Sequence, residues 1–222
     1  MDIKSVVLHT AELLEMKRFY MNVLGFELVN EEEDRFRIAI GSSELEFTAK
    51  AANGNPTYHF AFNIPSNRFD EAKSWAKDRV SLNEEDGEDE AHFDFLSARA
   101  LYFYDPAGNI VEFISRQKVS GKSAASFSIS SILNIAEVSL VIDDVDGAGE
   151  RLNKIGLTER NEEPIDSESL NFIGEGGAYI LLTQPGRRWI FSDKQAVIQP
   201  LQITLANNHQ MIINWDNKLE VY

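Results

Sequence analysis

Histidine and glutamate occur at matching places in two similar stretches of this sequence, and both residue types are common ligands of divalent metals. The stretch VVLHTA near the N-terminus resembles TYHFAF further along, which sets His9 beside His59. SELEFTA likewise resembles NIVEFIS, which sets Glu46 beside Glu112. Two imidazoles with one or two carboxylates can hold a metal and leave positions open for a substrate. The sequence therefore predicts that His9, Glu46, His59 and Glu112 converge on one metal ion.

Of these residues, Glu112 has the surroundings that most demand a cation. Its strand is apolar on both faces, with Ile110 and Ile114 on the same side as the carboxylate. Burying a lone carboxylate among such residues is costly. Glu46 shares its side with Glu44, so that position is less demanding. A single strand histidine or glutamate is usually structural or solvated, but the matched positions favour a metal site.

The elements that would carry these residues follow one order twice, strand, helix and three strands, which makes a βαβββ unit. The first unit is expected to have strands at 3–10, 26–30, 35–40 and 44–48 and a helix over 16–24. The second is expected to have strands at 58–64, 100–104 and 109–115 and a helix over 69–80. Such units form an α+β fold in which paired modules make open, cup-shaped mixed sheets with helices on the outer face. Strand alternation places His59 on the cup side, opposite Phe60 and Phe62.

A third copy follows a segment rich in serine, alanine and glycine. The chain therefore divides into a domain of two modules at 1–117, a linker at 118–132 and a C-terminal region at 133–222. That region is expected to contain a degenerate βαβββ module followed by a hairpin around Asn207 and Asn208.

The third copy lacks the candidate ligands. Aligned through its helix, it has Ser139 in place of the histidine and Leu181 in place of the glutamate. Glu137 has the strand phase of Ser139, but one carboxylate without histidine is a poor substitute. We therefore expect this region to pack against the cup, cover it or dimerise, and not to form a second active site.

Composition and charge exclude several classes of function. The chain of 222 residues has a net charge of −15 and no cysteine. Such acidity opposes binding to nucleic acid, and the absence of thiols removes disulfides, thiolate metal sites and cysteine nucleophiles. No apolar run approaches the length of a membrane helix, and no signal peptide is evident. We expect a cytoplasmic protein that binds a small molecule, contacts neither nucleic acid nor membrane, and can form a homodimer.

The remaining histidines and the acidic runs have less to suggest a site. His92 follows an acidic run and His209 lies beside a turn, so His209 is expected at the surface. The runs 31–34 and 84–90 lack the ligand spacing of a calcium loop and are expected to be solvated.

The paired units, together with VVLHTAELLEMKRFYMNVLGFELV and LYFYDPAGNIVEFI, resemble the vicinal oxygen chelate superfamily over residues 1–116. This superfamily includes glyoxalase I, extradiol dioxygenases, fosfomycin-resistance enzymes and bleomycin-binding proteins. The resemblance places His9, His59 and Glu112 on the metal positions of the family and Glu46 on the extra carboxylate position of glyoxalase-type members. It implies a divalent ion such as Fe, Ni, Zn, Co or Mn.

Three functions are compatible with this resemblance. If Glu46 or Glu112 is loosely bound to the metal, it can act as a catalytic base, which is lyase or isomerase chemistry. If only His9, His59 and Glu112 bind, two histidines and one carboxylate suit Fe(II) and ring cleavage by a dioxygenase. A non-catalytic binder, like the bleomycin-resistance relatives, would use the cup without metal. The presence of Glu46 favours the first.

Overall fold

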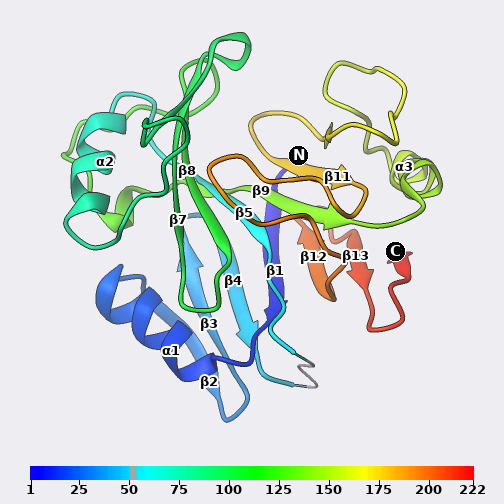
Figure 1. The fold of residues 1–222 in the computed structure, drawn as a ribbon, viewed down its shortest axis with the longest axis horizontal. Helices are drawn as coiled ribbons and strands as arrows, with labels where there is room; N and C mark the ends of the chain where they lie inside the picture. The colour runs from blue at the N-terminus through cyan, green and yellow to red at the C-terminus, as the bar shows by residue number, and fades with distance from the viewer. Residues whose placement is uncertain (51–53) are drawn as a thin grey trace.

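Two curled seven-stranded sheets form the frame of the protein (Figure 1). The computed structural model describes residues 1–50 and 54–222. The first sheet has the order β14-β13-β12-β1-β4-β3-β2 and the second β10-β11-β9-β5-β8-β7-β6. Strands of the first sheet are β1 (Ile3–His9), β2 (Leu28–Glu32), β3 (Arg35–Ile40), β4 (Ser43–Thr48), β12 (Leu201–Leu205), β13 (Gln210–Ile213) and β14 (Leu219–Val221). Strands of the second are β5 (His59–Asn63), β6 (Ala91–Phe93), β7 (Ala98–Tyr104), β8 (Ile110–Arg116), β9 (Asn134–Val141), β10 (Asn171–Ile173) and β11 (Tyr179–Thr183).

The helices lie on the outer faces of these sheets, and the α+β architecture of cup-shaped sheets built from βαβββ modules is confirmed (Figure 1). They are α1 (Leu13–Arg18), continued by a π-helical turn η1 (Phe19–Val23), then α2 (Phe69–Lys77) and α3 (Val145–Lys154); short 3-10 turns are η2 (Asp94–Leu96) and η3 (Ile129–Ser131). Helical spacing explains which residues face inward, since Ala72 and Ala76 of α2 are buried. In α3, Ala148 and Leu152 are likewise buried. None of the described helices has the length and apolar character needed to cross a bilayer.

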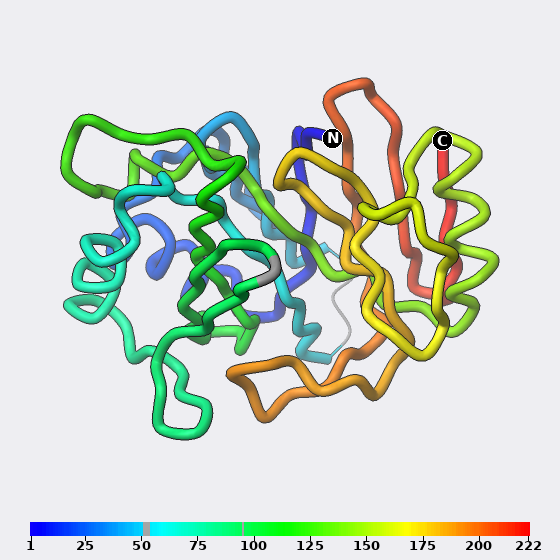
Figure 2. The backbone as a smooth tube through the Cα atoms, turned by 90° about the horizontal axis from the view of Figure 1, so that it is seen from above, coloured from blue at the N-terminus to red at the C-terminus, as the bar shows by residue number. Residues whose placement is uncertain are grey.

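The modules pair across the chain through their opening strands. β1 pairs antiparallel with β12, and β5 pairs antiparallel with β9. The first module therefore shares a sheet with the C-terminal strands, and the second shares one with the third module. Figure 2, which views the molecule from above, shows the C-terminal strands beside the N-terminal strand β1. The expected boundaries at 117 and 133 remain an interpretation of the sequence, and strand pairing crosses them in both sheets.

The C-terminal hairpin expected around Asn207 and Asn208 is present. β12 and β13 pair antiparallel on either side of it, and β14 adds a third strand that the sequence reading did not include. Asn208 takes a left-handed conformation with φ of 69°, which asparagine tolerates better than most residues. The segment 118–132 packs on α2, where Arg68 donates to the carbonyl of Ser123 and the Phe127 ring contacts Trp75.

A buried carboxylate joins the first module to the turn between β7 and β8. Asp105 opens this turn and accepts hydrogen bonds from the backbone N–H and the side-chain amide of Asn109, at 2.9 and 2.8 Å. The Tyr20 hydroxyl of η1 donates to the same carboxylate at 2.9 Å. Burial nevertheless outweighs these bonds and raises the pKa of Asp105 to about 6. The sequence motif DPAGN is thus a structural tie as well as a tight reversal.

This raised pKa predicts a specific pH dependence of stability. The unfolded chain ionises Asp105 near 3.8 and the folded chain near 6, so the folded state binds more protons between these values. The contribution of Asp105 to the free energy of unfolding should therefore fall by about 2–3 kcal/mol as pH rises from 4 to 6.5. Asp105→Asn should lack this component, so the stability difference between the variant and the wild type should change with pH by that amount. Denaturant unfolding at each pH measures it, and parallel curves for the two proteins would contradict the assignment.

Candidate functional site

Three buried side chains converge on the concave face of the second sheet: His59 of β5, Glu112 of β8 and Glu137 of β9. Each offers one ligand atom, and these atoms lie within 4.8 Å of one another. Nε2 of His59 is 3.4 Å from Oε2 of Glu112. The three side chains come from three adjacent strands, so the sheet itself fixes their spacing. This arrangement places one imidazole and two carboxylates around a common point.

The orientation of the His59 ring leaves Nε2 directed at the carboxylates. Nδ1 lies 3.1 Å from the carbonyl oxygen of Ile110, and because a carbonyl only accepts, Nδ1 carries the hydrogen. Burial lowers the pKa of His59, but the hydrogen bond and charge of Glu112, followed by the charge of Glu137, outweigh it and leave the pKa raised. A ring fixed through Nδ1–H is the arrangement found in histidines that bind metals through Nε2.

Glu137 is held in the cluster by Arg116 of β8, which is separated from β9 by β5. Nη2 of Arg116 donates to one oxygen of Glu137. Nη1 of the same arginine donates to Oδ1 of Asn63 at 2.7 Å and to the carbonyl of Gly177 at 3.3 Å. Burial and the charge of Glu112 raise the pKa of Glu137 to about 7, although Arg116 opposes the shift. The pKa of Glu137 stays raised although Arg116 and His59 oppose the shift, so a divalent cation would relieve the repulsion between the two carboxylates.

The cluster lies in a mainly apolar cavity of about 400 Å³. Aromatic side chains form much of its wall, including Tyr102, Phe172 and Trp189. The indole of Trp189 closes one side, with its centroid 4.9 Å from that of His59. A cavity of this size, with apolar walls and few polar groups, is typical of a site for a small molecule.

The structure does not bring His9 and Glu46 to this cluster, so the expected convergence of four residues on one ion is wrong. His9 ends β1 and Glu46 lies in β4, both in the first sheet. They line a different cavity of about 310 Å³. His59 and Glu112 are together as expected, and their role as metal ligands stays a prediction.

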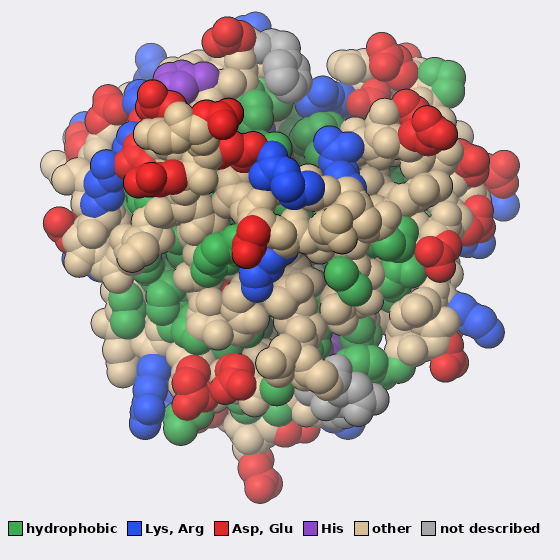
Figure 3. Space-filling view, in the orientation of Figure 1, with side chains coloured by type: hydrophobic (Ala, Val, Ile, Leu, Met, Phe, Trp, Pro, Cys, Tyr) green, Lys and Arg blue, Asp and Glu red, His purple; other side chains and the backbone are tan. Residues whose placement is uncertain are grey.

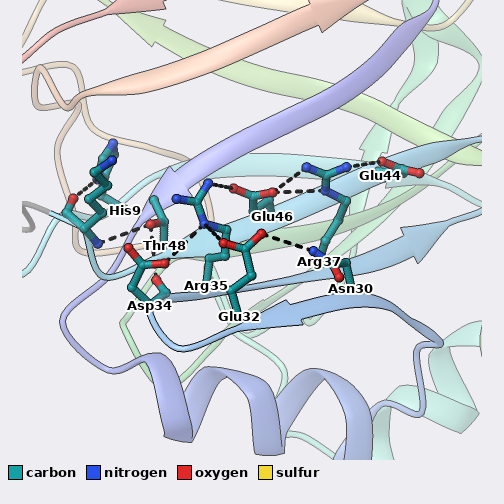
Figure 4. Close-up of polar contacts among 10 residues, drawn as sticks. His9, Asn30, Glu32, Asp34, Arg35, Arg37, Glu44, Glu46 and Thr48 are labelled. Carbon is teal, nitrogen blue, oxygen red and sulfur yellow. Dashed lines mark hydrogen bonds and ion pairs between the residues drawn. The ribbon is translucent and has the colours of Figure 1, made fainter.

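Two arginines form ion pairs with the carboxylate of Glu46 (Figure 4). Nη2 of Arg37 lies 2.6 Å from Oε2 of Glu46, and Nε of Arg37 donates to the same oxygen at 3.0 Å. Arg35 contacts the other oxygen at 3.4 Å. His9 lies apart from this network, with Nδ1 at 3.1 Å from the carbonyl of Lys50. Burial lowers the pKa of His9, which keeps its ring neutral. A metal site at Glu46 is therefore not supported.

Strand register explains why the matched histidines do not occupy equivalent positions. Glu112 pairs with Ala61 in the second sheet, and Glu46 pairs with Val7 in the first. His59 lies two residues before Ala61, whereas His9 lies two residues after Val7. Taking the two glutamates as equivalent, Ser5 is therefore the counterpart of His59, and His9 is the counterpart of Asn63.

The same register shows why Glu137 belongs to the cluster. In the third module Leu181 pairs with Ser139, and Glu137 lies two residues before that serine. Glu137 therefore occupies in its module the position that His59 occupies in the second. The alignment through the helix places Ser139 opposite the histidine, and for that reason Glu137 was not predicted as a ligand. The strand phase of Glu137 was the available signal, but pairing of β9 with β5 was needed to give it a partner.

Comparison with known proteins places the chain in a family. Residues 2–113 match the sequence model described as Glyoxalase/Bleomycin resistance protein/Dioxygenase superfamily, and the chain belongs to this superfamily. Residues 135–187, which include β9 to β11, match a second model described as Toxoflavin-degrading enzyme. No curated protein matches the chain.

Among the solved structures similar to this chain, the first described here has a TM-score above 0.5 and shares its fold. A putative dioxygenase from Bacillus subtilis subsp. subtilis is 17% identical with a TM-score of 0.54, and the match covers 82% of this chain and 63% of that one. Lactoylglutathione lyase from Agrobacterium tumefaciens is 21% identical with a TM-score of 0.43, over 50% of this chain and 90% of that one. A glyoxalase family protein from Enterococcus faecalis is 23% identical with a TM-score of 0.42, over 51% and 96% of the two chains.

The two cups predict opposite effects of one substitution on the metal-free fold. Glu112→Gln removes a charge that repels Glu137, so with chelator present the free energy of unfolding should stay equal or rise, by about 1–2 kcal/mol. Glu46→Gln removes the charge that pairs with two partly exposed arginines, so here the free energy of unfolding should fall by about 1–2 kcal/mol. Denaturant unfolding at neutral pH measures both. Loss of stability in Glu112→Gln would show that a cationic partner balances this carboxylate in the apo protein.

Proposed function

We propose that the protein is a divalent-metal-dependent enzyme that degrades a small, flat, oxygenated ring compound in the cup of the second sheet. The observation that carries this proposal is the buried cluster of His59, Glu112 and Glu137 at the floor of an apolar cavity. The cluster and the walls together support the proposal, because two mutually repelling carboxylates beside a histidine in an apolar cup are typical of functional sites.

The donor set fits a divalent ion. One imidazole nitrogen and two carboxylate oxygens suit Mn, Fe, Co, Ni or Zn, and three protein ligands leave coordination positions for a substrate. The Ile110 carbonyl orients His59, and Arg116 holds one oxygen of Glu137. When bound, the ion would supply Lewis-acid stabilisation of negative charge on substrate oxygens.

The cavity walls support a flat substrate. Tyr102, Phe172 and Trp189 offer aromatic surfaces, on which a ring compound stacks favourably. Arg187 lies at the wall and provides positive charge for anionic oxygens. Figure 3 shows acidic side chains scattered over one face, so local positive charge at Arg187 helps an anionic ligand approach. The match of residues 135–187 to a model named for toxoflavin degradation supports this substrate class, since that segment supplies Glu137 and Phe172.

Proton transfer in the same cup is the second candidate. Glu46, whose presence in the sequence favours lyase or isomerase chemistry, lies in the other sheet. The observation that now favours it is the pKa of Glu137, raised by burial to about 7, which suits a general base near neutral pH.

Metal binding should be confined to the second cup. Isothermal titration of chelator-treated protein with Mn²⁺ should give one site in the wild type. Glu112→Gln and Glu137→Gln should each weaken binding by at least about tenfold, because each removes an anionic ligand. The matched variants His9→Gln and Glu46→Gln should bind as the wild type does. Equal binding by all five proteins would refute the assignment of the ligands.

Turnover distinguishes the reactions. Toxoflavin and catechol should be offered to protein loaded with Mn²⁺, Fe²⁺, Ni²⁺ or Zn²⁺, while substrate absorbance and dissolved oxygen are recorded. Ring degradation predicts loss of absorbance that consumes oxygen and stops with chelator. Exchange of substrate protons with deuterated water, without oxygen uptake, would favour proton transfer. Ligand binding that is indifferent to chelator, with no turnover, would contradict an enzyme and favour a binding protein.

A further inference from the structure

One segment covers a side of the cup beside the metal-ligand candidates. This segment, here called the roof, comprises residues 184–198 between β11 and β12. It folds on itself through hydrogen bonds from Gly186 N to Ala196 O at 2.8 Å and from Trp189 N to Lys194 O at 3.0 Å. At its tip, Trp189 is 6% exposed and points its ring at His59. The roof is therefore a compact hairpin that presents one indole to the floor of the cavity.

One carboxylate from a distant segment holds the roof down. Glu85 accepts a hydrogen bond from Nη2 of Arg188 and another from the backbone N–H of Phe191. The two donors lie on either side of Trp189 in the sequence, so Glu85 binds the roof before and after the indole. Figure 2 shows the roof, in orange, beside the loop that carries Glu85. This part of the acidic run 84–90 is thus not merely solvated, as the sequence reading expected.

The segment carrying Glu85 is itself anchored to the second sheet. Asn83 donates its backbone N–H to the carbonyl of Tyr102 in β7 at 2.8 Å. The Asn83 side-chain amide donates to the carbonyl of Phe191, also at 2.8 Å. The segment with Asn83 and Glu85 is therefore tied to the sheet that carries the cluster. Its two side chains bond both the N–H and the carbonyl of Phe191.

Phe191 shows that the closed roof is under backbone strain. Its φ of 51° lies in the left-handed region, which bulky residues rarely adopt. Stacking on Tyr102, at 5.0 Å between centroids, and the bonds from Glu85 and Asn83 compensate for this strain. Such strain persists only while surrounding contacts hold it, so loss of these contacts favours a relaxed backbone at Phe191.

We propose that Glu85 is a positioning residue that keeps the roof closed, so that Trp189 excludes water from the ions and flat ligands bound over His59. The proposal rests on the proposed function for the identity of those ligands. Glu85 acts through Arg188 and Phe191 and does not touch the cluster. Loss of its carboxylate removes two hydrogen bonds to a charged acceptor, which is enough to move an open–closed equilibrium about ten- to a hundredfold.

The test follows Trp189 directly. In a Trp75→Phe/Trp215→Phe background, Trp189 is the remaining tryptophan of the chain, which has three. Glu85→Ala should raise the acrylamide quenching constant of Trp189 by at least about threefold. Glu84→Ala, an equal charge change at an exposed neighbour, should leave it unchanged, and Glu85→Gln should give an intermediate value. If the background variant does not fold, subtraction of Trp189→Phe from the wild type gives the same quantity.

Mn²⁺ alone supplies the second measurement. Glu85→Ala should keep the Mn²⁺ dissociation constant within about twofold of the wild type, while the relaxation of water protons by bound Mn²⁺ increases because water reaches the ion. Quenching and relaxation that stay at the wild-type values would overturn the role of Glu85. Failure of wild-type protein to bind Mn²⁺ would instead overturn the proposed function, and the quenching of Trp189 would still decide whether Glu85 holds the roof.

Discussion

The antiparallel pairing of opening strands is the constraint on which the rest of this structure depends. β5 pairs with β9 and β1 pairs with β12, so the second module meets the third and the first meets the C-terminal strands. Each cup therefore combines segments that are far apart along the chain. Because the partner strand supplies one wall and one position facing the cup, the identity of that partner decides which cup can hold a charged ligand.

The two cups have matching strand orders around their opening strands but balance their carboxylates differently. In the first, Glu46 is neutralised by Arg37 and Arg35 on the adjacent strand β3. In the second, Arg116 pairs with Glu137 and Glu112 lies against His59, while the two carboxylates repel each other. An ion pair already formed leaves nothing for a metal to gain, whereas an unbalanced pair of buried carboxylates gains stability from a cation. Charge balance, more than the number of candidate ligands, separates a structural cup from a functional one.

Much of the fold could be predicted from the sequence, because strand alternation, helical spacing and turn residues are local signals. The hairpin at Asn208 and the alternating strands are examples. The site was only partly predictable. The apolar surroundings of Glu112 and the strand phase of His59 are local properties, and both pointed to the cup. The partner of His59 depends on strand pairing, which the sequence similarity around His9 and His59 does not reveal. The roles of Glu137 and Glu85 likewise depend on contacts between distant segments, since Glu137 faces Glu112 only through β9 and Glu85 reaches Phe191 only through the folded roof.

The central claim is that the second cup, and not the first, holds the metal. Anomalous diffraction from crystals equilibrated with Mn²⁺ tests it most directly, because the signal locates the ion without assuming its ligands. The account predicts one anomalous peak among Nε2 of His59 and the carboxylates of Glu112 and Glu137, roughly 2–2.3 Å from each ligand atom. A peak between His9 and Glu46, or no peak in the second cup at a concentration that saturates binding in solution, would contradict it.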